Sequence, residues 1–280
     1  MRTFVALSLL FVLTFISSCH NSDRDDDRET LSARENAMAY HLFDDLFREV
    51  HKFAIRDTLL NDTGLTQRLN SCIDKAFLSD TVAVFPLYLT LDYGEPDDTE
   101  ECDDGFTRTG SILATFTGKY LGKGTKIKME IADYKKGNYQ VEGKITYENL
   151  GLDSNGNVLF EWIVDDGRIT GINTEINWTG NHILRWVEGY SPESHEIIED
   201  DVFQISGVSQ GRNSRGSSFI NEIDEPYFSE LSCPWFTRGK STLTVQNLPT
   251  RHIDYDTDTA CNNVIQQKRA NTVFQVVIPY

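Results

Sequence analysis

The sequence predicts a mainly β protein whose antiparallel sheets, arranged as a sandwich or as a barrel-like meander, follow one N-terminal amphipathic helix. Three observations support this fold class. Apolar and polar residues alternate with a period of two from residue 82 onward, Gly- and Asn-rich turns separate these stretches, and no long helical pattern interrupts them. Strands with one apolar and one polar face are typical of antiparallel sheets, so a parallel sheet with crossover helices is not expected.

The first 18 residues have the layout of a bacterial lipoprotein signal peptide. Arg2 precedes an apolar run from Phe4 to Ile16, which is shorter than the ~20 residues that a membrane span requires. Two serines then lead directly to Cys19. An ordinary secretory signal is the other alternative, but a lone cysteine after two small residues favours lipidation. We therefore expect cleavage before Cys19 and a diacylglyceryl group on its thiol, which would hold the chain firmly at a membrane.

An acidic tether, a helix and a connector are expected between the lipid anchor and the sheet. Residues 19–30 are rich in Asp and read as a solvated, extended tether. Residues 31–56 carry apolar side chains at three- and four-residue steps, which predicts a helix that Thr30 could cap. The helix either packs on the domain or stands as a short stalk. Residues 57–81 lack a clear period and are expected to be an irregular connector.

Residues 82–280 are expected to form the antiparallel β domain. Ile127, Met129 and Ile131 show the alternation with polar neighbours, and the later stretches repeat it at the spacing of roughly eleven to thirteen strands. Tight turns are expected at Lys136-Gly137-Asn138, Asn155-Gly156, Asp166-Gly167 and Asn213 to Gly216. Similar short sequences recur around residues 91–110 and 233–263, so the domain could consist of two related halves, about 82–180 and 181–280.

The overall charge is strongly acidic and restricts the classes of partner. The chain has 26 Lys and Arg against 43 Asp and Glu, a net charge of −17. Nucleic-acid binding requires a basic surface that neutralises phosphates, and none is visible, so no nucleic-acid partner is expected. An acidic surface also keeps the folded body away from anionic lipid, and it leaves the lipid anchor as the contact with the membrane.

Four cysteines remain after Cys19, and an even number in an exported protein indicates disulfides. A zinc site is the rival interpretation, but no two of these cysteines have the close spacing of zinc ligands. Three pairings are open. We favour Cys72–Cys102 and Cys233–Cys261, because each closes a local loop of similar length.

No motif predicts a catalytic, cofactor or metal site. Ser209 lies in a G-x-S-x-G sequence, but a hairpin turn follows it where a nucleophile elbow needs a helix. The segment from Asp153 to Asn157 lacks the Gly and Glu that an EF-hand loop requires, and a hairpin is favoured. The acidic loop 97–104 is a better cation candidate, although a solvated loop is favoured there. The histidines lack metalloprotease spacing, so packing or exposure is expected for His41 and His51.

Several short motifs are spread over roughly residues 72–280. They are Asp92-Tyr93-Gly94, Cys102, Asp104-Gly105, Arg108-Thr109-Gly110, Arg185-Trp186-Val187-Glu188-Gly189, Asp200-Asp201-Val202-Phe203, Ile205-Ser206-Gly207, Cys233-Pro234-Trp235, Arg251-His252-Ile253-Asp254-Tyr255 and Cys261-Asn262-Asn263. Together they resemble the motifs of a group of uncharacterised lipoproteins of the Bacteroides lineage, and the acidic tract after Cys19 resembles the tract that follows the lipidated cysteine in surface-exported lipoproteins of that group. The resemblance implies a β-rich exported lipoprotein with the same cysteine frame, facing the cell surface from the outer membrane, and it brings no activity.

Two functional hypotheses follow from the sequence. The first is a non-catalytic binding or structural role at the cell envelope, with a glycan or an envelope protein as ligand. Trp162, Trp178, Trp186 and Tyr190 could then form an exposed strip that stacks on sugars, although packing in the core is the more usual fate of such residues. The second is an exported glycan hydrolase, which would need two carboxylates facing each other across a cleft, roughly 5–10 Å apart.

Overall fold

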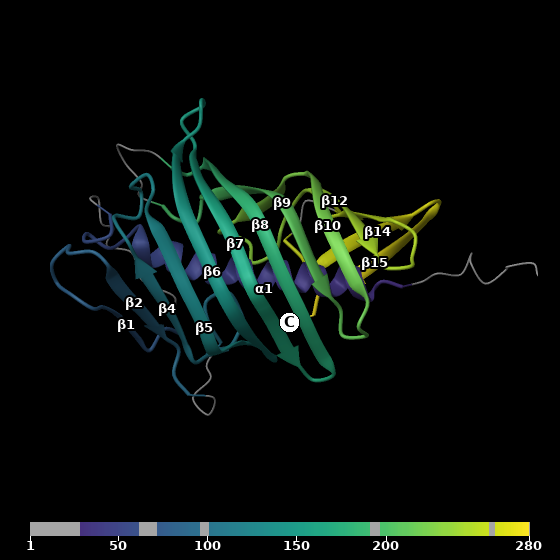
Figure 1. Cartoon of the computed structure of the whole chain (residues 1–280), viewed down its shortest axis with the longest axis horizontal. Helices are drawn as coiled ribbons and strands as arrows, with labels where there is room; N and C mark the ends of the chain where they lie inside the picture. Colours follow the sequence, from purple (N-terminus) through teal and green to yellow (C-terminus); the bar gives the residue numbers. More distant parts are fainter. Residues whose placement is uncertain (1–28, 62–71, 96–100, 191–196, 258–260, 280) are drawn as a thin grey trace, which may run out of the picture.

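The computed structural model describes residues 29–61, 72–95, 101–190, 197–257 and 261–279. In these residues the chain forms one helix and a single antiparallel sheet, so the expected fold class is confirmed. The sheet is not closed into a barrel. Figure 1 shows its strands side by side along the long axis of the molecule, with the helix lying across them on one face.

The helix, α1, covers Leu31–Ala54 and confirms the expected helix to within two residues. Its 24 residues span about 36 Å. Thr30 occupies the N-cap position, but its side chain makes no capping hydrogen bond, and this expectation was wrong. The carboxylate of Glu29 accepts the hydrogen bond of the Ser32 amide at 2.7 Å, where it also complements the positive end of the helix dipole.

In the described part of the chain, fifteen strands make up the sheet. In the first half they are β1 (Lys75–Leu78), β2 (Leu87–Asp92), β3 (Arg108–Thr109), β4 (Ser111–Phe116), β5 (Lys126–Lys136), β6 (Tyr139–Leu152), β7 (Val158–Gly171) and β8 (Thr174–Glu188). In the second half they are β9 (Val202–Arg212), β10 (Ser218–Glu225), β11 (Tyr227–Glu230), β12 (Lys240–Val245), β13 (Arg251–Asp254), β14 (Val264–Arg269) and β15 (Thr272–Val277).

The strands follow one another as a meander, from β1 and β2 through β4 to β10 and then β12 to β15. The short strands β3 and β11 pair with β5 and β9 outside this path. Two expectations need correction. Residues 75–78 are β1 rather than part of an irregular connector, and Asp166-Gly167 is a bulge inside β7 rather than a hairpin turn. The β7–β8 turn comes later, at Asn173, which has a φ of 58°.

The sheet curves around α1, which lies close to β8 in the middle of the sheet and to β15 at its end. In Figure 1 the last strands, in yellow, pass toward the same helix from the other end of the meander. Most of α1 is therefore buried, including charged residues such as Asp45 and Glu49. A helix enclosed in this way is neither a stalk nor a surface helix.

The core consists mainly of aromatic rings between α1 and the middle strands. Tyr40 of α1 meets Trp178 at 5.1 Å between ring centroids, and Phe43 stacks on the same indole at 5.2 Å. Glycines on the inner face of the sheet make room for these rings. A methyl group at Gly167 would lie 2.8 Å from the ring of Phe43, so a side chain there would push helix and sheet apart.

Candidate functional site

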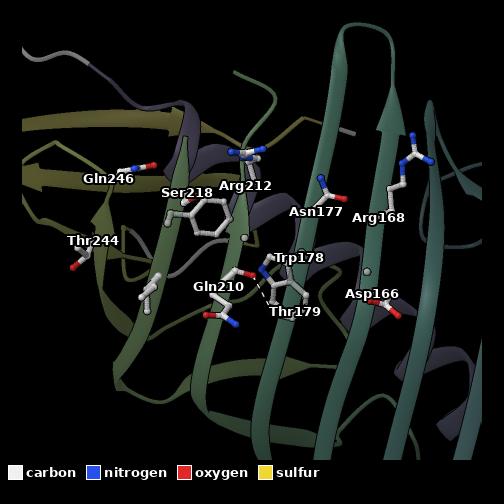
Figure 2. Close-up of a pocket in the computed structure, with 14 residues that line it drawn as sticks. Asp166, Arg168, Asn177, Trp178, Thr179, Gln210, Arg212, Ser218, Thr244 and Gln246 are labelled. Atoms are coloured by element: carbon white, nitrogen blue, oxygen red, sulfur yellow. Dashed lines mark hydrogen bonds between the residues drawn. The ribbon is translucent and has the colours of Figure 1, made fainter. Parts of the chain in front are cut away.

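A groove crosses the outer face of the sheet over β7, β8, β9, β10 and β12, and has a volume of about 630 Å³. Figure 2 shows the residues that line it, among them the polar side chains of Asn177, Gln210 and Thr244 on the strands. One row follows the register of the strands. Arg168 pairs with Asn177, Asn177 with Arg212, and Arg212 with Ser218. The backbone N–H of Gln246 donates to the backbone carbonyl of Ser218, so Gln246 completes the row.

A second row of outward side chains runs parallel to the first, two residues along each strand. Thr179 pairs with Gln210, Gln210 with Ile220, and Ile220 with Thr244. Asp166, one of two exposed residues in the β7 bulge, stands at the end of this row. Five strands at ~4.8 Å spacing give a groove about 19 Å long, and two residues of a strand give a separation of about 7 Å between the rows.

The floor of the groove is backbone. Between the two outward rows lies a row of paired residues, one from each strand, formed by Gly167, Trp178, Gly211 and Phe219. The side chains of Trp178 and Phe219 are buried on the helix side. Two of these four positions are glycines. The bulge between Val164 and Gly167 adds local twist. Glycine and bulge together let the strands approach α1, which hollows the opposite face.

Most polar side chains of the groove are free to bind a ligand. Within the described residues, the side chains of Asn177, Gln210, Ser218, Thr244 and Gln246 make no hydrogen bond to the protein. Amides and hydroxyls both donate and accept hydrogen bonds. These side chains are therefore not used in hydrogen bonds within the described fold. They present a dense array of donors and acceptors to solvent.

The charges of the groove nearly balance. Arg168 is held by Glu175 at 2.9 Å and lies 4.0 Å from Glu142, so its charge is compensated. Arg212 has no ion pair in the described part of the chain, and Asp166 is the single carboxylate on the groove wall. The groove therefore has no strong electrostatic preference of its own.

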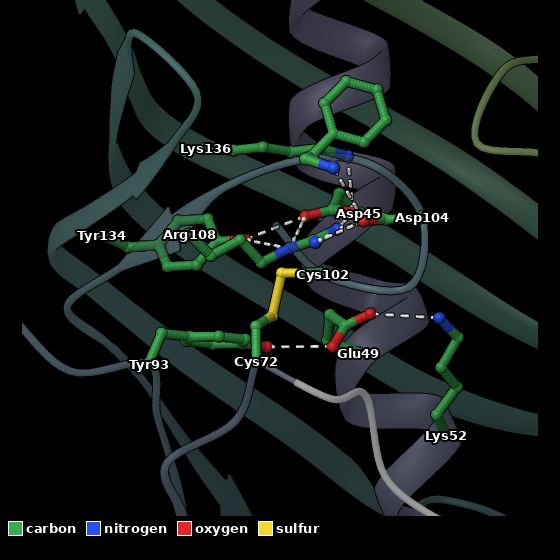
Figure 3. Close-up of a disulfide and its surroundings, with 11 residues drawn as sticks. Asp45, Glu49, Lys52, Cys72, Tyr93, Cys102, Asp104, Arg108, Tyr134 and Lys136 are labelled. Atoms are coloured by element: carbon green, nitrogen blue, oxygen red, sulfur yellow. Dashed lines mark hydrogen bonds and ion pairs between the residues drawn. A yellow bond between two sulfur atoms is a disulfide. The ribbon is translucent and has the colours of Figure 1, made fainter. Parts of the chain in front are cut away.

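A second polar region, the charged cluster of Asp45, Asp104, Arg108 and Lys136, lies between α1 and the Cys72–Cys102 disulfide (Figure 3). Arg108 bridges the two carboxylates, at 2.5 Å from Asp45 and 2.6 Å from Asp104. Lys136 reaches Asp45 at 2.7 Å, and Tyr134 donates to the same carboxylate at 2.9 Å. The charged groups of the cluster are therefore paired almost entirely with one another.

The pKa values in the charged cluster reflect burial and pairing. Burial by itself would raise the pKa of Asp45, but the charges of Arg108 and Lys136 outweigh it and hold that pKa well below its usual value. Burial lowers the pKa of Lys136 to about 8 even with Asp45 beside it. Asp45 is thus an ionised partner rather than a proton donor, and the cluster serves to fix α1.

Other polar contacts of α1 have the same fixing role. His51 lies 2.6 Å from the Tyr120 hydroxyl and 3.0 Å from Asp201, and Asp201 also accepts from the indole of Trp186. Arg48 donates to the carbonyls of Leu231 and Cys233. A small cleft of about 250 Å³ lies beside these contacts, lined by acidic and basic side chains of α1 and of the neighbouring loops.

Among the expected site residues, Cys19 lies outside the described residues. The two favoured disulfides are confirmed, with Cys72 bonded to Cys102 and Cys233 bonded to Cys261. They close loops of similar length, with sequence separations of 30 and 28 residues. Residues next to each disulfide contact the polar side of α1: Arg108, shortly after Cys102, pairs with Asp45, and the carbonyl of Cys233 accepts from Arg48.

Ser209 is buried on the inner face of β9 and donates to Asn36 of α1 at 3.0 Å. This contact fits the strand interpretation and leaves no access for a substrate. The carboxylate of Asp153 accepts from the amides of Asn155 and Asn157 and pairs with Arg185, as a hairpin requires. These bonds occupy the oxygens that a cation would need.

The proposed aromatic strip is not exposed. Trp162, Trp178 and Trp186 are fully buried, and Tyr190 packs on Trp186, so the core interpretation is confirmed. His41 and His51 are buried as well. Of the acidic loop 97–104, residues 97–100 lie outside the described residues, whereas Asp104 is bound by Arg108. No group of three or more His, Cys, Asp or Glu among the described residues is placed to hold a metal ion.

Sequence reasoning missed the groove, although a pattern for it exists. The outward positions of β5 are charged, at Lys126, Lys128 and Glu130. Consecutive outward positions in part of β8 and β12 instead carry amides and hydroxyls, at Asn177, Thr179 and Asn181 and at Thr242 and Thr244. Uncharged polar side chains on adjacent solvent-facing strands were the available indication, but only the register shows that they meet.

Comparisons with protein-family models, curated proteins and solved structures find no match for this chain. Several motif residues behind the resemblance described above have a clear place in the fold. Tyr93 donates to Glu49 at 3.0 Å, Arg108 holds Asp45, and Trp235 stacks on His41 at 4.1 Å. Each of these motif residues contacts α1. No helix in the described ranges has the length and apolar character needed to cross a membrane.

Proposed function

We propose that the protein is a lipid-anchored lipoprotein of the outer membrane that faces the cell surface and binds a ligand in the groove without chemical turnover. The single observation that carries this proposal is the groove itself, in which five of the six outward amide and hydroxyl side chains make no hydrogen bond within the described residues. The lipoprotein leader and two disulfides support an exported chain.

The geometry favours binding over glycan hydrolysis. A hydrolase needs two carboxylates on opposite sides of the scissile bond. The groove wall has one, Asp166. The smaller cleft does collect carboxylates, but its Asp45 and Asp104 are both bonded to Arg108. An acid that holds a proton for a leaving group is therefore missing from that pair.

A thiol introduced into the groove tests orientation and binding together. The four other cysteines are in disulfides and Cys19 is expected to carry lipid, so T244C provides a unique free thiol on the groove wall. We expect a membrane-impermeant maleimide to label T244C on intact cells. S209C, which faces the core from β9, serves as the unlabelled control. Labelling of T244C only after lysis would contradict surface exposure.

The same thiol reports binding. A dye on the T244C thiol should change its fluorescence saturably with at least one member of a panel of neutral oligosaccharides, acidic oligosaccharides and peptides, and the ligand should be recovered intact. Cleavage of the ligand would favour the hydrolase alternative. Absence of a saturable response to all three classes would overturn the binding role. Mass spectrometry of the mature N-terminus checks the lipid on Cys19.

A further inference from the structure

We infer that the ligand of the groove is an uncharged oligosaccharide lying across β7, β8, β9, β10 and β12. This inference rests on the proposed binding function and names its ligand class. It is carried by the chemistry of the groove wall, the position of the groove within the sheet, and the charge of the molecule.

The groove wall matches a ligand rich in hydroxyl groups. Six of its outward side chains are amides or hydroxyls, and each can donate and accept a hydrogen bond. Sugar hydroxyls have the same double capacity. The described contacts leave Asn177, Gln210 and Gln246 free to pair with them. Ile220, at 45% exposed, adds one apolar surface for the C–H face of a sugar ring.

The position of the groove argues against a peptide ligand. A peptide that binds a sheet usually adds as a strand to an edge, where backbone groups are unpaired. Here the ladders between β7, β8, β9, β10 and β12 already use those groups. A peptide helix would need an apolar groove. Ile220 is the one aliphatic residue among the outward side chains of the groove.

Charge argues against an acidic polymer. The chain has a net charge of −17, which repels polyanions at a distance. Within the groove, Arg168 is compensated by Glu175, and Asp166 opposes the remaining Arg212. A length of about 19 Å suits a linear chain of several sugars better than a single sugar.

The test measures binding to the full lipidated protein by calorimetry, in a detergent without a sugar headgroup. The probes are neutral hexasaccharides of glucose, mannose, galactose and xylose, their disaccharides, a hexagalacturonate and a six-residue peptide. We expect at least one neutral hexasaccharide to bind saturably, roughly ten-fold more tightly than its disaccharide. Its affinity should not change between about 0.05 and about 0.5 M salt, since no charges are paired.

Matched variants assign the binding to the groove. N177A/Q210A removes two hydrogen-bonding amides and should lower the affinity roughly ten-fold. N181A/Q204A makes the same changes on the same outward face of β8 and β9, outside the groove, and should leave the affinity within about two-fold.

The outcomes separate the two proposals. If only hexagalacturonate or the peptide binds, and N177A/Q210A weakens that binding, the groove is a binding site but the inference of an uncharged ligand is overturned. If a neutral hexasaccharide binds and both double variants behave alike, the groove is not its site and this inference also fails. If no probe of any class binds, the proposed function fails with it.

Discussion

Asp45 holds α1 to the neighbouring strands β3 and β5 through ion pairs with Arg108 and Lys136. All three side chains are nearly inaccessible to solvent. Buried ion pairs gain little net stability over apolar packing, but loss of one partner leaves a buried charge without compensation. The contact therefore fixes where α1 sits against the sheet more than it adds stability.

Asp45→Asn tests this role. The substitution keeps the shape but removes the charge that compensates Arg108 and Lys136, so we expect a loss of about 3–5 kcal/mol in unfolding free energy. Urea denaturation measures it. Glu225→Gln breaks the exposed pair with Lys240 and should cost less than about 1 kcal/mol. Equal losses in the two variants would show that Asp45 is not a buried anchor.

Acid should destabilise the protein through the same carboxylate. The native pKa of Asp45 lies well below its unfolded value of about 3.9, because the charges of Arg108 and Lys136 outweigh its burial. Its contribution is therefore complete above about pH 4 and is lost as the pH falls through the native pKa. When the pH is lowered below about 4, we expect the urea concentration at the unfolding midpoint to fall. It should fall less steeply with pH in Asp45→Asn. Identical slopes would contradict this assignment.

At the scale of elements, α1 is enclosed by the sheet on its apolar side and by two segments next to disulfides on its polar side. Phe106 and Arg108 follow shortly after Cys102 and contact the helix, and Trp235 does so shortly after Cys233. His41 of α1 lies near the rings of both Phe106 and Trp235. Each disulfide therefore anchors one end of a segment that packs on the helix.

Removing either disulfide should destabilise the protein by a similar amount. Cys72→Ser/Cys102→Ser and Cys233→Ser/Cys261→Ser each open a loop of about 30 residues, for which chain entropy gives about 3–4 kcal/mol. Thermal or urea unfolding of the two double variants measures this loss. A change of less than about 1 kcal/mol in either variant would mean that its loop is held in place by packing alone.

At the scale of the whole molecule, one continuous core joins the first and last strands through α1. Buried residues of β2, β7, β12 and β15 belong to the same cluster as those of the helix. No second sheet packs on the inner face in the described residues, so this face depends on α1 for burial. The chain should therefore unfold as one cooperative unit.

Deletion of residues 31–56 should abolish folding, because it exposes Trp162, Trp178 and Trp186 on the inner face of the sheet. We expect the shortened chain to lose cooperative unfolding by near-UV circular dichroism. Deletion of residues 20–28, expected to be a solvated tether, is the control and should leave the unfolding midpoint unchanged. A cooperative transition without the helix would show that the sheet is stable by itself.

Local sequence patterns determined the secondary structure and the covalent frame. Alternation located the strands after residue 82 but not β1, the spacing of apolar residues located α1, and loop length favoured the observed disulfides. Periodicity depends on neighbours in the chain and loop length on the spacing of the cysteines, so a sequence shows both. The same rule explains the error at Asp166-Gly167, because a bulge and a hairpin turn both use residues that tolerate positive φ, and Asp166 has a φ of 51°.

Only the tertiary structure decided what encloses α1 and which side chains form the groove. Asp45 and Glu49 look like solvent-exposed residues in the sequence, yet distant partners such as Arg108 and Tyr93 bury them. The groove likewise needs Thr179, Gln210 and Thr244 in one row on three different strands. Contacts between residues tens of positions apart depend on strand register and sheet curvature, which no local pattern specifies.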